Sequence, residues 1–569
     1  MTPWTAPRTT PPPPASTARQ PVIIVGCGPV GLGAALELAR FGVPTVVLER
    51  RTSPSRHPKT RNFNTRTMEI ARGWGPAVYR RLRGIDTPDG WKSPIRFFDT
   101  VVGKEFGRID SRGFEGPGPE VSPALPVMSS QDLITEILRE AAAATGLVEL
   151  RFGHRVTELT SGAGDLDAEA VVQVTDESTG ESYPLSGAAL VAADGVDSLV
   201  RQSLGVRLEG EQGIHHFVNC YFHSPVEQYV GERTGVLLYV ANPDALGVLQ
   251  PLDANGRWLC QISVPPEQWN RETWTDDRVR HWVRAAVGVP GLEVDVRSVG
   301  VWRMNVTVAE RLVHGRVVLC GDAAHQFPPT GGLGVNTGLQ GMHNAMWKLA
   351  LCVRGLADWS LLDTYDTERR PPARRTADQS YENFRNVARM GAAAYGFGED
   401  LDPDAILRET RRYGNHLGVE FGTVYDSAAV VPDGTRPPTV EDDYSDYAPS
   451  ATPGCRAPHV RLGPGGALST LDLFGPGFTV LTGPDGTAWR EAAVTAARRL
   501  RLPVAGYTVG SPGLTDPDGL FLRRYGIGSE GAVVIRPDGY VGWRSADAPT
   551  AAGEELTEAI EQIIGHGEY

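Results

Sequence analysis

The chain has 569 residues, of which 41% are hydrophobic and 22% charged, and its formal net charge is −13 at pH 7. This length exceeds the roughly 250–300 residues that one hydrophobic core supports, so we expect several domains. The acidic balance argues against a nucleic-acid or anionic-membrane partner, because both require a basic surface. No apolar run reaches the ~18 residues that span a bilayer, so no membrane partner is expected.

The six cysteines are scattered, which bears on both compartment and chemistry. No two form a C-x-x-C pair, so neither a dithiol centre nor a metal site is predicted, and we expect buried free thiols in a cytoplasmic protein. They are Cys27, Cys220, Cys260, Cys320, Cys352 and Cys455. Residues 1–20 are rich in proline and lack the apolar segment of a secretory signal, so we expect a disordered tail.

The ordered chain is expected to begin with a strand–helix–strand unit. The β-branched run over 22–25 predicts a buried parallel strand that stops at a glycine. Small and apolar residues recur at helical spacing over 29–41 and end at Gly42, which is typical of a helix C-cap. Residues 45–48 predict the second strand, so this segment favours an α/β fold with a Rossmann-like sheet.

Further along, helical and extended patterns alternate. A Pro-, Gly- and Asp-rich stretch over 431–464 predicts a linker, and the residues after it carry strands and helices of their own, which indicates a further domain. Periodicity predicts a helix over 130–143, alternating strands over 148–193, a separate antiparallel sheet over 218–264, a strand over 317–320 and long helices over 338–389.

A glycine-rich turn joins the first predicted strand to the first predicted helix. It reads Gly26-Cys27-Gly28-Pro29-Val30-Gly31, in which the first glycine permits the turn, the second admits a pyrophosphate and the third allows close packing. Glu49, followed by Arg50, is placed to accept hydrogen bonds from ribose hydroxyls. The turn predicts an adenine-dinucleotide site; the alternative is a turn that only packs helix on sheet. A second match over 526–531 precedes a strand and is interpreted as a turn.

Two later motifs also follow predicted strands. Residues 194–201 read D-G-V-D-S-L-V-R, and residues 321–329 read G-D-A-A-H-Q-F-P-P before a G-G-L-G-V-N segment and a helix. In order and approximate spacing the three motifs resemble the single-component (class A) FAD-dependent aromatic hydroxylases of the p-hydroxybenzoate hydroxylase fold, over about residues 21–389. The alternative for Asp194 and Asp322 is a helix N-cap. His325 is interpreted as a packing residue, not a base.

The resemblance implies that FAD is the cofactor and that NADPH or NADH binds transiently as co-substrate. Asp322 would accept from the ribityl chain, and Asp194 would serve the FAD pyrophosphate and NAD(P)H together. A helix start would stabilise negative charge on the reduced flavin. The backbone there belongs to Gly334, Val335 and Asn336; Pro328 and Pro329 would wall the isoalloxazine, and Gly321 and Val156 are further implied contacts.

A second segment sharpens the resemblance. Residues 57–60 (H-P-K-T) and 64–69 (N-T-R-T-M-E) are similar to bacterial chlorophenol hydroxylases, within a three-domain phenol and aromatic-polyketide hydroxylase subgroup. Lys59, Thr60 and Arg66 would then line the flavin entrance, and Gln131 matches a FAD-contacting glutamine. The alternative for Lys59 and Arg66 is a solvated surface.

The sequence departs from the family pattern at two positions. Arg61 stands where phenol hydroxylases carry an acid that takes the phenol proton, so deprotonation by that route is in doubt. Gly341 stands in Q-G-M-H-N where many relatives have Q-D-A-x-N, so a salt bridge found elsewhere is expected to be missing.

The C-terminal part resembles the thioredoxin-like domain of phenol and aromatic-polyketide hydroxylases. Residues 533–544 match its closing hairpin, with Asp538-Gly539 as the turn. Because it has no C-x-x-C, we expect a structural or interfacial role. The expected domains are a FAD-binding domain (21–90, 122–205, 300–395), an inserted antiparallel-sheet substrate domain (91–121, 206–299), a helical linker region (396–464) and the thioredoxin-like domain (465–569).

These features predict an O2- and NAD(P)H-dependent FAD monooxygenase that hydroxylates a phenol-like, polyketide or heteroaromatic ring. The family uses a flavin C4a-hydroperoxide, so the protein must exclude water and orient the ring. The alternatives are a Baeyer–Villiger oxygenation on the same scaffold and a non-catalytic FAD-fold binding protein. A homo-oligomer is compatible with the sequence.

No side chain stands out as a catalytic base. The substrate pocket is expected between the FAD domain and the antiparallel sheet, where polar residues alternate along predicted strands. The alternative for each of them is a satisfied sheet surface. The candidates are Asn219, Tyr221 and His223 on one strand face, with Tyr239, Gln250 and Arg303.

Overall fold

The N-terminal strand–helix–strand unit forms as predicted in the computed structural model, which describes residues 20–253, 255–394 and 403–565. It comprises β1 (Val22–Val25), α1 (Pro29–Arg40) and β2 (Thr45–Glu49). All four residues of β1 are buried, which agrees with a central parallel strand. The expected tail lies outside the described residues, except for Gln20.

A six-stranded sheet organises the region around this unit. Its order is β17-β18-β11-β1-β2-β7, with β7 (Val148–Phe152), β11 (Ala189–Ala192), β17 (Val313–His314) and β18 (Val317–Leu319). All pairs are parallel except β17 with β18. The carboxyl ends of β18, β11, β1 and β2 therefore lie side by side, which is where open α/β sheets bind ligands.

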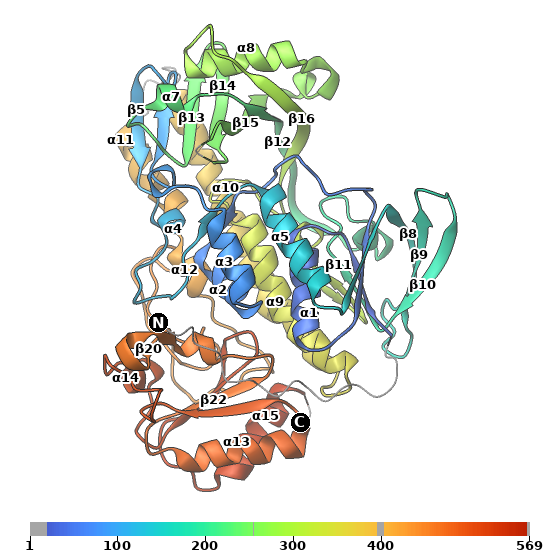
Figure 1. The fold of residues 1–569 in the computed structure, drawn as a ribbon, viewed down its shortest axis with the longest axis vertical. Helices are drawn as coiled ribbons and strands as arrows, with labels where there is room; N and C mark the ends of the chain where they lie inside the picture. Colours follow the sequence, from blue (N-terminus) through green and yellow to red (C-terminus); the bar gives the residue numbers. More distant parts are fainter. Residues whose placement is uncertain (1–19, 254, 395–402, 566–569) are drawn as a thin grey trace.

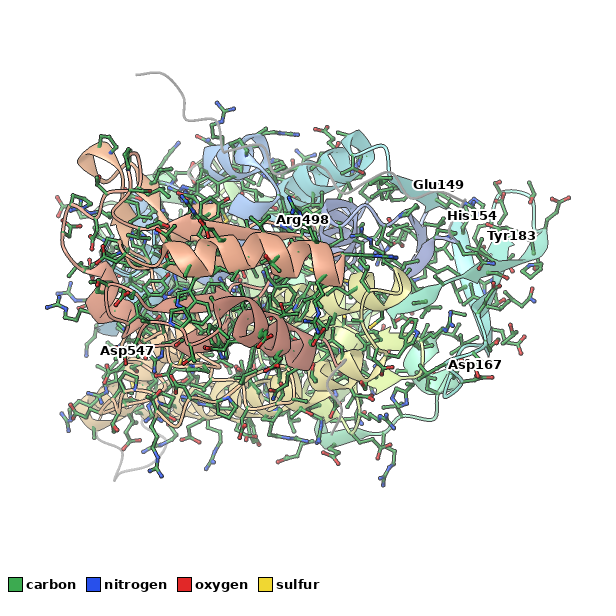
Figure 2. The ribbon with its side chains drawn as sticks, turned by 90° about the horizontal axis from the view of Figure 1, so that it is seen from below. Glu149, His154, Asp167, Tyr183, Arg498 and Asp547 are labelled. Atoms are coloured by element: carbon green, nitrogen blue, oxygen red, sulfur yellow. The ribbon has the colours of Figure 1, made fainter. Side chains whose placement is uncertain are left out.

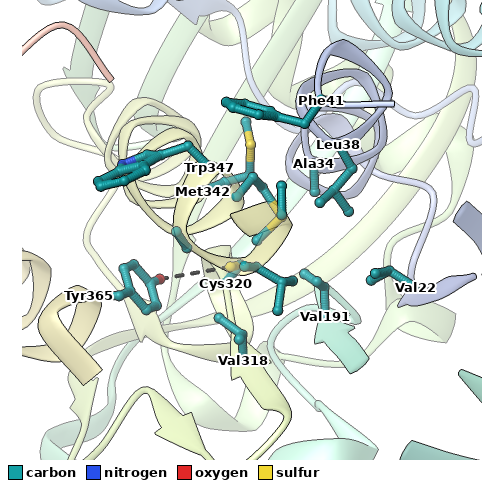
Figure 3. Packing of buried hydrophobic residues seen from close by; sticks show 14 of the residues in the cluster. Val22, Ala34, Leu38, Phe41, Val191, Val318, Cys320, Met342, Trp347 and Tyr365 are labelled. Atoms are coloured by element: carbon teal, nitrogen blue, oxygen red, sulfur yellow. Dashed lines mark hydrogen bonds between the residues drawn. The ribbon is translucent and has the colours of Figure 1, made fainter. Parts of the chain in front are cut away.

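Helices α1 and α9 (Gly334–Val353) cover one side of this sheet and form the core in Figure 3. Gly33 lets them approach, because a Cβ there would lie 2.7 Å from the Met342 side chain. The Tyr365 hydroxyl, from α10 (Ser360–Ala394), contacts Cys320 Sγ at 3.7 Å and donates to the Leu319 carbonyl. The long helices predicted over 338–389 are thus α9 and α10.

Smaller elements surround the parallel sheet. The alternating pattern over 148–193 is only partly a separate sheet, because β7 and β11 join the parallel one. The antiparallel remainder projects from the body, where Figure 2 shows His154 beside Tyr183; the Tyr183 hydroxyl bonds His154 Nδ1 at 3.0 Å. The antiparallel sheet consists of β8 (His154–Ser161), β9 (Ala170–Asp176) and β10 (Ser182–Gly187). The other small elements of this region are β3 (Asn62–Phe63), β6 (Val127–Met128), α2 (Thr65–Gly73), α3 (Pro76–Gly84), α4 (Arg112–Glu115), α5 (Gln131–Ala144) and α6 (Leu199–Ser203).

A second sheet of eight strands forms one end of the molecule (Figure 1). It is antiparallel as predicted, except that β4 pairs with β13 in parallel. Helix α8 (Asp276–Val287) packs on the face that carries Val218, Cys220 and Phe222. The strand order is β19 (His325–Gln326), β16 (Asp295–Ala309), β12 (Leu208–His223), β15 (Arg257–Val264), β14 (Ala245–Pro251), β13 (Leu237–Asn242), β4 (Ile95–Phe98) and β5 (Glu105–Ile109), and α7 (Glu227–Val230) lies between β12 and β13.

The C-terminal region lies at the opposite end (Figure 1) and has a four-stranded sheet in the order β23-β22-β24-β25. The hairpin of β24 and β25 forms as predicted, and Gly539 in its turn has φ +80°. The second glycine-rich match lies between α14 and β24, as expected for a turn. The bounds are β20 (Arg461–Leu462), β21 (Leu468–Ser469), β22 (Phe478–Thr482), β23 (Val504–Thr508), β24 (Ala532–Ile535), β25 (Val541–Ser545), α13 (Thr487–Leu500), α14 (Phe521–Tyr525) and α15 (Ala552–Ile563).

The segment expected to be a linker is packed against its neighbours. It starts with α11 (Pro403–Glu409) and α12 (Leu417–Phe421), and residues 422–460 form no further helix or extended strand. Nevertheless Tyr425, Tyr444 and Arg456 in that stretch are buried. Its Gly and Pro content therefore reflects an irregular path across the surface of the folded body, not a free tether.

Buried ion pairs hold the C-terminal region against the parallel-sheet region. Glu368 of α10 accepts from Lys348 at 2.7 Å and from Arg536 at 2.6 Å, and all three side chains are fully buried. Arg536 also pairs with Asp538. The two cations hold the pKa of the Glu368 carboxyl well below its usual range, despite burial. Such a pair is costly to break, because either partner alone would be a buried, uncompensated charge.

Two further features of the described residues concern membranes and metals. No helix among them has the length and apolar character needed to cross a bilayer. In the same residues, no group of three or more His, Cys, Asp or Glu side chains gathers as a metal site would require. All six cysteines are free and buried, which confirms the predicted thiol state.

Candidate FAD and substrate site

The three glycines of the first turn meet three different constraints. Gly26 has φ +103°, and a Cβ there would lie 2.3 Å from the Ala193 carbonyl oxygen. A Cβ on Gly31 would lie 2.0 Å from the Gly26 oxygen, so the helix could not approach the strand. Gly28 is different, because a Cβ on it would meet open space. That space, beside the start of α1, is a cradle that a pyrophosphate fits.

The carboxylate of Glu49 closes this cradle on the side of β2. It accepts hydrogen bonds from the backbone N–H of Cys27 at 3.1 Å and of Arg51 at 2.9 Å. These bonds fix the side chain at the carboxyl end of β2, where a ribose would lie next to the glycine turn. Arg50 beside it is exposed, and Pro29 and Val30 begin α1, with Val30 packed against Gly321.

Asp194 lies at the end of the neighbouring strand β11. Its Oδ2 accepts from the Val200 N–H at 3.2 Å, while its buried Oδ1 has no partner within the described chain. Burial raises the pKa of this carboxyl, and hydrogen bonds from Ser198 and Val200 oppose that rise. The N-cap residue of α6 is Ser198, and the bond from Val200 shows that one Asp194 oxygen also serves the start of this helix, as the alternative proposed. The orphaned Oδ1 fits an acceptor for a ligand hydroxyl or a nicotinamide group.

Asp322 and Lys59 face each other across the same cleft. Burial raises the pKa of the Asp322 carboxyl, and the Lys59 ammonium counteracts it. Desolvation and Arg51 lower the pKa of Lys59, whereas Asp322 raises it. Gln131 holds the Lys59 loop, because its Oε1 accepts from the Lys59 N–H at 3.2 Å and from the Thr60 N–H at 3.1 Å. The remaining NH2 group of Gln131 is free to donate to a cofactor.

The start of α9 completes the cofactor cleft. No side chain caps this helix, so its first amides remain available to a negatively charged ring edge. The Asn336 side chain is used within the protein: its Oδ1 accepts from Asn64 N–H and Thr67 Oγ1, and its Nδ2 donates to the Asn62 carbonyl. Contacts to a flavin would therefore come from the backbone, as the sequence predicts.

Taken together, these groups suit FAD. The cradle at Gly28, the orphaned Asp194 oxygen, the cleft carboxyl of Asp322 and the uncapped start of α9 follow adjacent strands of one sheet. They offer a phosphate cradle, hydroxyl acceptors and an electropositive helix end in the order in which a dinucleotide flavin would need them. Arg201 ties two of these loops together by donating to the Ala323 carbonyl at 3.1 Å.

A cavity of about 710 Å³ lies beside the cleft, between the eight-stranded sheet and the end of α10. Its walls are mainly aromatic and apolar, and Pro329 and Thr330 of the third motif form the end next to the cofactor cleft. Polar residues, among them Asn242, Asp244, Arg278 and His281, also contribute to the lining. The aromatic lining includes Phe97, Phe106, Phe217, Tyr239, Trp282 and Phe384, and the polar lining includes His215 and Gln261.

Tyr239 brings a polar group to this cavity. Its hydroxyl bonds the Tyr413 hydroxyl at 2.7 Å, and the Tyr239 ring stacks on Phe97. Burial raises the pKa of both tyrosines, and the nearby Arg61 opposes that rise. Arg61 itself donates to the Pro251 and Val236 carbonyls at 2.5 and 2.8 Å, and burial lowers its pKa to about 10.

The other substrate candidates do not line the cavity. Asn219 accepts from the Trp302 indole at 2.7 Å, and Tyr221 bonds His223 at 2.9 Å and Arg257 at 2.9 Å. These three share the face that carries Phe217, but at the far end of the strand, and Gln250 is buried in β14 outside the lining.

Arg303 and Arg66 do not fit their expected roles. The Arg303 guanidinium lies over Trp269, and Arg303 is not among the residues that line the cavity. Arg66 is buried, pairs with Glu69 and donates to the Asp538 carbonyl at 2.7 Å. Its charge serves the contact with the C-terminal region and not the flavin entrance. Val156 is buried in β8 and packs in the core.

Sequence reasoning missed Tyr413, Phe217 and His215. Tyr413 lies in a 3₁₀ turn (Thr410–Gly414) within the expected linker region, and no local pattern links it to Tyr239, which is 174 residues away. The strand residues could have been found, because the alternation of Asn219, Tyr221 and His223 continues two steps further back along β12.

Comparisons with known proteins identify the family. Residues 19–380 match the family model of a FAD binding domain, and residues 450–567 match that of an aromatic-ring hydroxylase C-terminal region. The fold and the cleft thus define a FAD-dependent oxidoreductase. The chain belongs to the family of FAD-dependent aromatic-ring hydroxylases.

Its relatives include enzymes of polyketide and chlorophenol metabolism. The chain is 36% identical to tetracenomycin A2 monooxygenase-dioxygenase of Streptomyces glaucescens, over 96% of this chain and 97% of the relative. It is 32% identical to 2,4-dichlorophenol 6-monooxygenase of Cupriavidus pinatubonensis, over 97% of each.

Two solved structures resemble it along almost the whole length. The flavin-dependent monooxygenase PieE, in complex with FAD and substrate, has a TM-score of 0.87 and 33% identity, over 97% of this chain and 100% of that one. Aklavinone-11 hydroxylase, in a ternary complex with FAD and aklavinone, has a TM-score of 0.83 and 31% identity over the same shares.

Proposed function

We propose that this protein is an NAD(P)H- and O2-dependent FAD monooxygenase that hydroxylates a polycyclic, phenol-bearing aromatic substrate of the polyketide type. The observation that carries this proposal is the aromatic cavity of about 710 Å³ that ends at Pro329. That volume lies within the roughly 300–1,000 Å³ of pockets for drug-sized ligands, well above the need of one phenol ring. Relatives that act on tetracenomycin A2 and aklavinone support the same substrate class.

The chain's own residues would hold the cofactor as the cleft suggests. The amides around Gly28 would hold the pyrophosphate, Glu49 a ribose and Asp322 the ribityl hydroxyls, while the first amides of α9 would face the pyrimidine edge. Bound FAD supplies hydride acceptance from NAD(P)H and activation of O2. The protein's part is to keep water out and to orient the substrate ring.

Tyr239 is the group best placed to orient a ring hydroxyl. It lies in the cavity wall, and its bond with Tyr413 leaves one hydroxyl proton of the pair to donate onward. The Arg61 guanidinium, held by two backbone carbonyls behind the pair, favours negative charge on that side of the cavity. A substrate hydroxyl bound there would lose its proton more readily, which activates the ring carbon next to it.

The direct test is an assay of the purified, FAD-loaded protein with NADH or NADPH and ¹⁸O-labelled O2. We expect one ¹⁸O atom in the product and a kcat/KM at least about tenfold higher for a hydroxyanthraquinone than for 2,4-dichlorophenol, which is a difference of about 1.4 kcal/mol. An ester or ring-expanded lactone of the same added mass, or its ring-opened hydrolysis product with one further water, would instead indicate a Baeyer–Villiger reaction. NAD(P)H oxidation that no aromatic compound stimulates would contradict the proposal.

The role of Tyr239 is tested by Tyr239→Phe. We expect kcat/KM to fall about tenfold to a hundredfold at pH 7, with a smaller loss at pH values where the free substrate phenol is already ionised. Tyr229→Phe is the matched control, because Tyr229 is 40% exposed in the same region and should leave the activity unchanged. Equal activity of the two variants at every pH would remove Tyr239 from the mechanism.

A further inference from the structure

A second cavity, of about 330 Å³, lies on the other side of α9 from the cofactor cleft. Gly338 of α9 faces Val30 and Gly321 at the cleft. Gln340, two residues on and thus about 200° further around the helix axis, faces the second cavity. The remaining walls come from Asn64, from Leu333, Asn336 and Thr337 at the start of α9, from α10 and from residues 419–424. None of these residues lines the proposed substrate cavity.

The walls of this cavity are positively charged. Two arginines, Arg369 and Arg375 of α10, contribute to the lining, and none of the lining residues is an Asp or Glu. Arg375 reaches the rim, where it pairs with Asp443 at 3.1 Å. Arg369 lies deeper and is only 3% exposed.

Within the described residues, Arg369 has neither the carboxylate partner of the buried Arg456 and Arg536 nor the two backbone carbonyls that hold the buried Arg61. Its Nη1 donates to the Tyr425 hydroxyl at 3.1 Å, but its buried Nε has no hydrogen-bond partner within the described chain. No ion pair to a carboxylate joins it among those residues. By contrast, Arg456 pairs with Glu69 and Arg536 with Glu368, both fully inside the protein. An uncompensated buried guanidinium is strongly unfavourable, so a partner is required.

Gly341 marks the place where a carboxylate is missing. A Cβ at this position would lie 3.9 Å from Arg369 Nε and 3.4 Å from the Tyr365 hydroxyl, which is ordinary contact distance. A short acidic side chain would therefore reach Nε without disturbing the helix. This is the position at which the sequence departs from the Q-D-A-x-N pattern.

We propose that the cavity beside Arg369 binds a small oxyanion, such as a carboxylate or inorganic phosphate, as the counterion of that guanidinium. Arg369 lines the cavity and its Nε is a buried donor without a partner among the described residues, and a guanidinium edge matches a carboxylate in particular. The Gln340 amide, on the same side of α9, can donate to the same anion.

The bound anion would join three parts of the structure. It would connect α9 and α10 with residues 419–424, and Tyr425, which follows them, stacks on Tyr540 of the C-terminal region at 4.0 Å between ring centroids. Binding of the anion would therefore stabilise the junction between the parallel-sheet region and the C-terminal region, by an amount that grows with anion concentration.

The test measures the thermal midpoint Tm of the FAD-loaded protein against acetate, phosphate and chloride at constant ionic strength. We expect a saturable rise of about 2–4 °C with an oxyanion and less with chloride. Gly341→Asp should raise Tm without added anion and abolish the dependence, because the new carboxylate takes the same donor. Gly341→Ala, which adds the Cβ without the charge, should keep the dependence of the wild type.

Two results would overturn the proposal. One is a Tm of the wild type that does not depend on which anion is present; the other is a Gly341→Asp variant that responds like Gly341→Ala. A crystal of the unmodified protein soaked in selenate, an oxyanion with an anomalous signal, provides a measurement that needs no variant. We expect an anomalous peak next to Arg369 Nε, and a cavity without one would also overturn the site. Because Tm and diffraction do not depend on turnover, failure here is distinguishable from failure of the proposed hydroxylase activity.

Discussion

At the cofactor cleft, some residues serve ligand binding and others serve the packing of the fold, and Gly28 is the clearest case of the first kind. Its backbone is extended, with φ −81°, and space is open where its side chain would be. Gly31 has the opposite environment, because its missing Cβ is filled by the Gly26 carbonyl. The same residue type therefore serves a ligand at one position and the packing of α1 at the other.

We predict that Gly28→Val folds but loses FAD. The new side chain would occupy the pyrophosphate space, and a loss of about 3 kcal/mol in binding corresponds to roughly a hundredfold weaker affinity. Flavin absorbance after gel filtration and circular dichroism of the same sample measure the two effects. Gly84→Ala, also facing open space but at the end of α3, is the control and should retain flavin. Normal flavin content in Gly28→Val would show that the cofactor phosphates lie elsewhere.

His325 gives a prediction about acid stability. It is 4% exposed, stacks on Phe327, and burial together with Arg369 lowers its pKa to about 3. The folded-state pKa is depressed, so the unfolded chain binds the proton first, and stability is present above pH 6.5 and is lost as the pH falls below it.

Between pH 6.5 and pH 5 the neutral His325 should account for a loss of about 2 kcal/mol of unfolding free energy. Urea unfolding at several pH values checks this, and His325→Gln should reduce the slope in that window without removing it, because burial also lowers the pKa of His57 and of His459 to about 4. Most carboxylates titrate below it, so they do not obscure the effect. An unchanged slope in the variant would mean that His325 is protonated in the folded protein or contributes through another group.

At the scale of elements, the position of helix α10 is held by a buried ion-pair network. Helix α10 carries Glu368 into the contact with Lys348 of α9 and Arg536 of β24's hairpin, while Glu382 of the same helix pairs with Arg385 at the surface. Both residues are glutamates of the same helix, but Glu368 is buried and Glu382 lies at the surface. Buried pairs cost several kcal/mol when one partner is removed, and exposed pairs cost little.

We predict that Glu368→Gln lowers the free energy of unfolding by about 3–5 kcal/mol, because Lys348 loses its carboxylate partner and Arg536 retains only Asp538. Glu382→Gln should change it by no more than about 0.5 kcal/mol. Denaturation with urea, monitored by tryptophan fluorescence, measures both. Equal midpoints for the two variants would refute the structural importance of the buried network.

At the scale of the whole molecule, the C-terminal region is part of one folded body and is not an appendage. Arg456 pairs with Glu69 of α2, and Trp347 of α9 packs edge-on against Phe478 of β22. Helix α2 begins at Asn64 and Thr65, next to Asn336 at the start of α9. The interface thus reaches the cofactor cleft through one short helix.

We predict that a chain ending at residue 449 is poorly soluble and contains little flavin. It would remove Arg456 from Glu69, which keeps only Arg66, and Arg536 from Glu368, which keeps only Lys348. It would also expose the apolar surface around Trp347. Soluble yield and the ratio of flavin to protein, compared with the full-length chain, measure the effect. A monomeric, flavin-loaded fragment of normal stability would show that the parallel-sheet region folds independently of the C-terminal region.

The sequence predicts the cofactor cleft more fully than the substrate cavity. Its three motifs follow β1, β11 and β18, and their requirements are local: a glycine at a tight turn, or an acid at a strand end. The cavity depends on how the strands of the eight-stranded sheet pack, and this is why Tyr239 lies in its wall while Arg303, on another strand of the same sheet, does not. Alternation along one strand sets relative directions, but only the packing of the sheet decides which face is inside.

By itself, then, the sequence determined that this chain binds a dinucleotide flavin, because short motifs encode the backbone shape that holds phosphate and ribose. The tertiary structure alone decided the wall of the substrate cavity and the role of Arg66, which joins the C-terminal region instead of the flavin entrance. The physical reason is distance along the chain. Arg456 and Glu69 lie 387 residues apart and form their ion pair only when the whole molecule is folded, so no local sequence pattern can predict it.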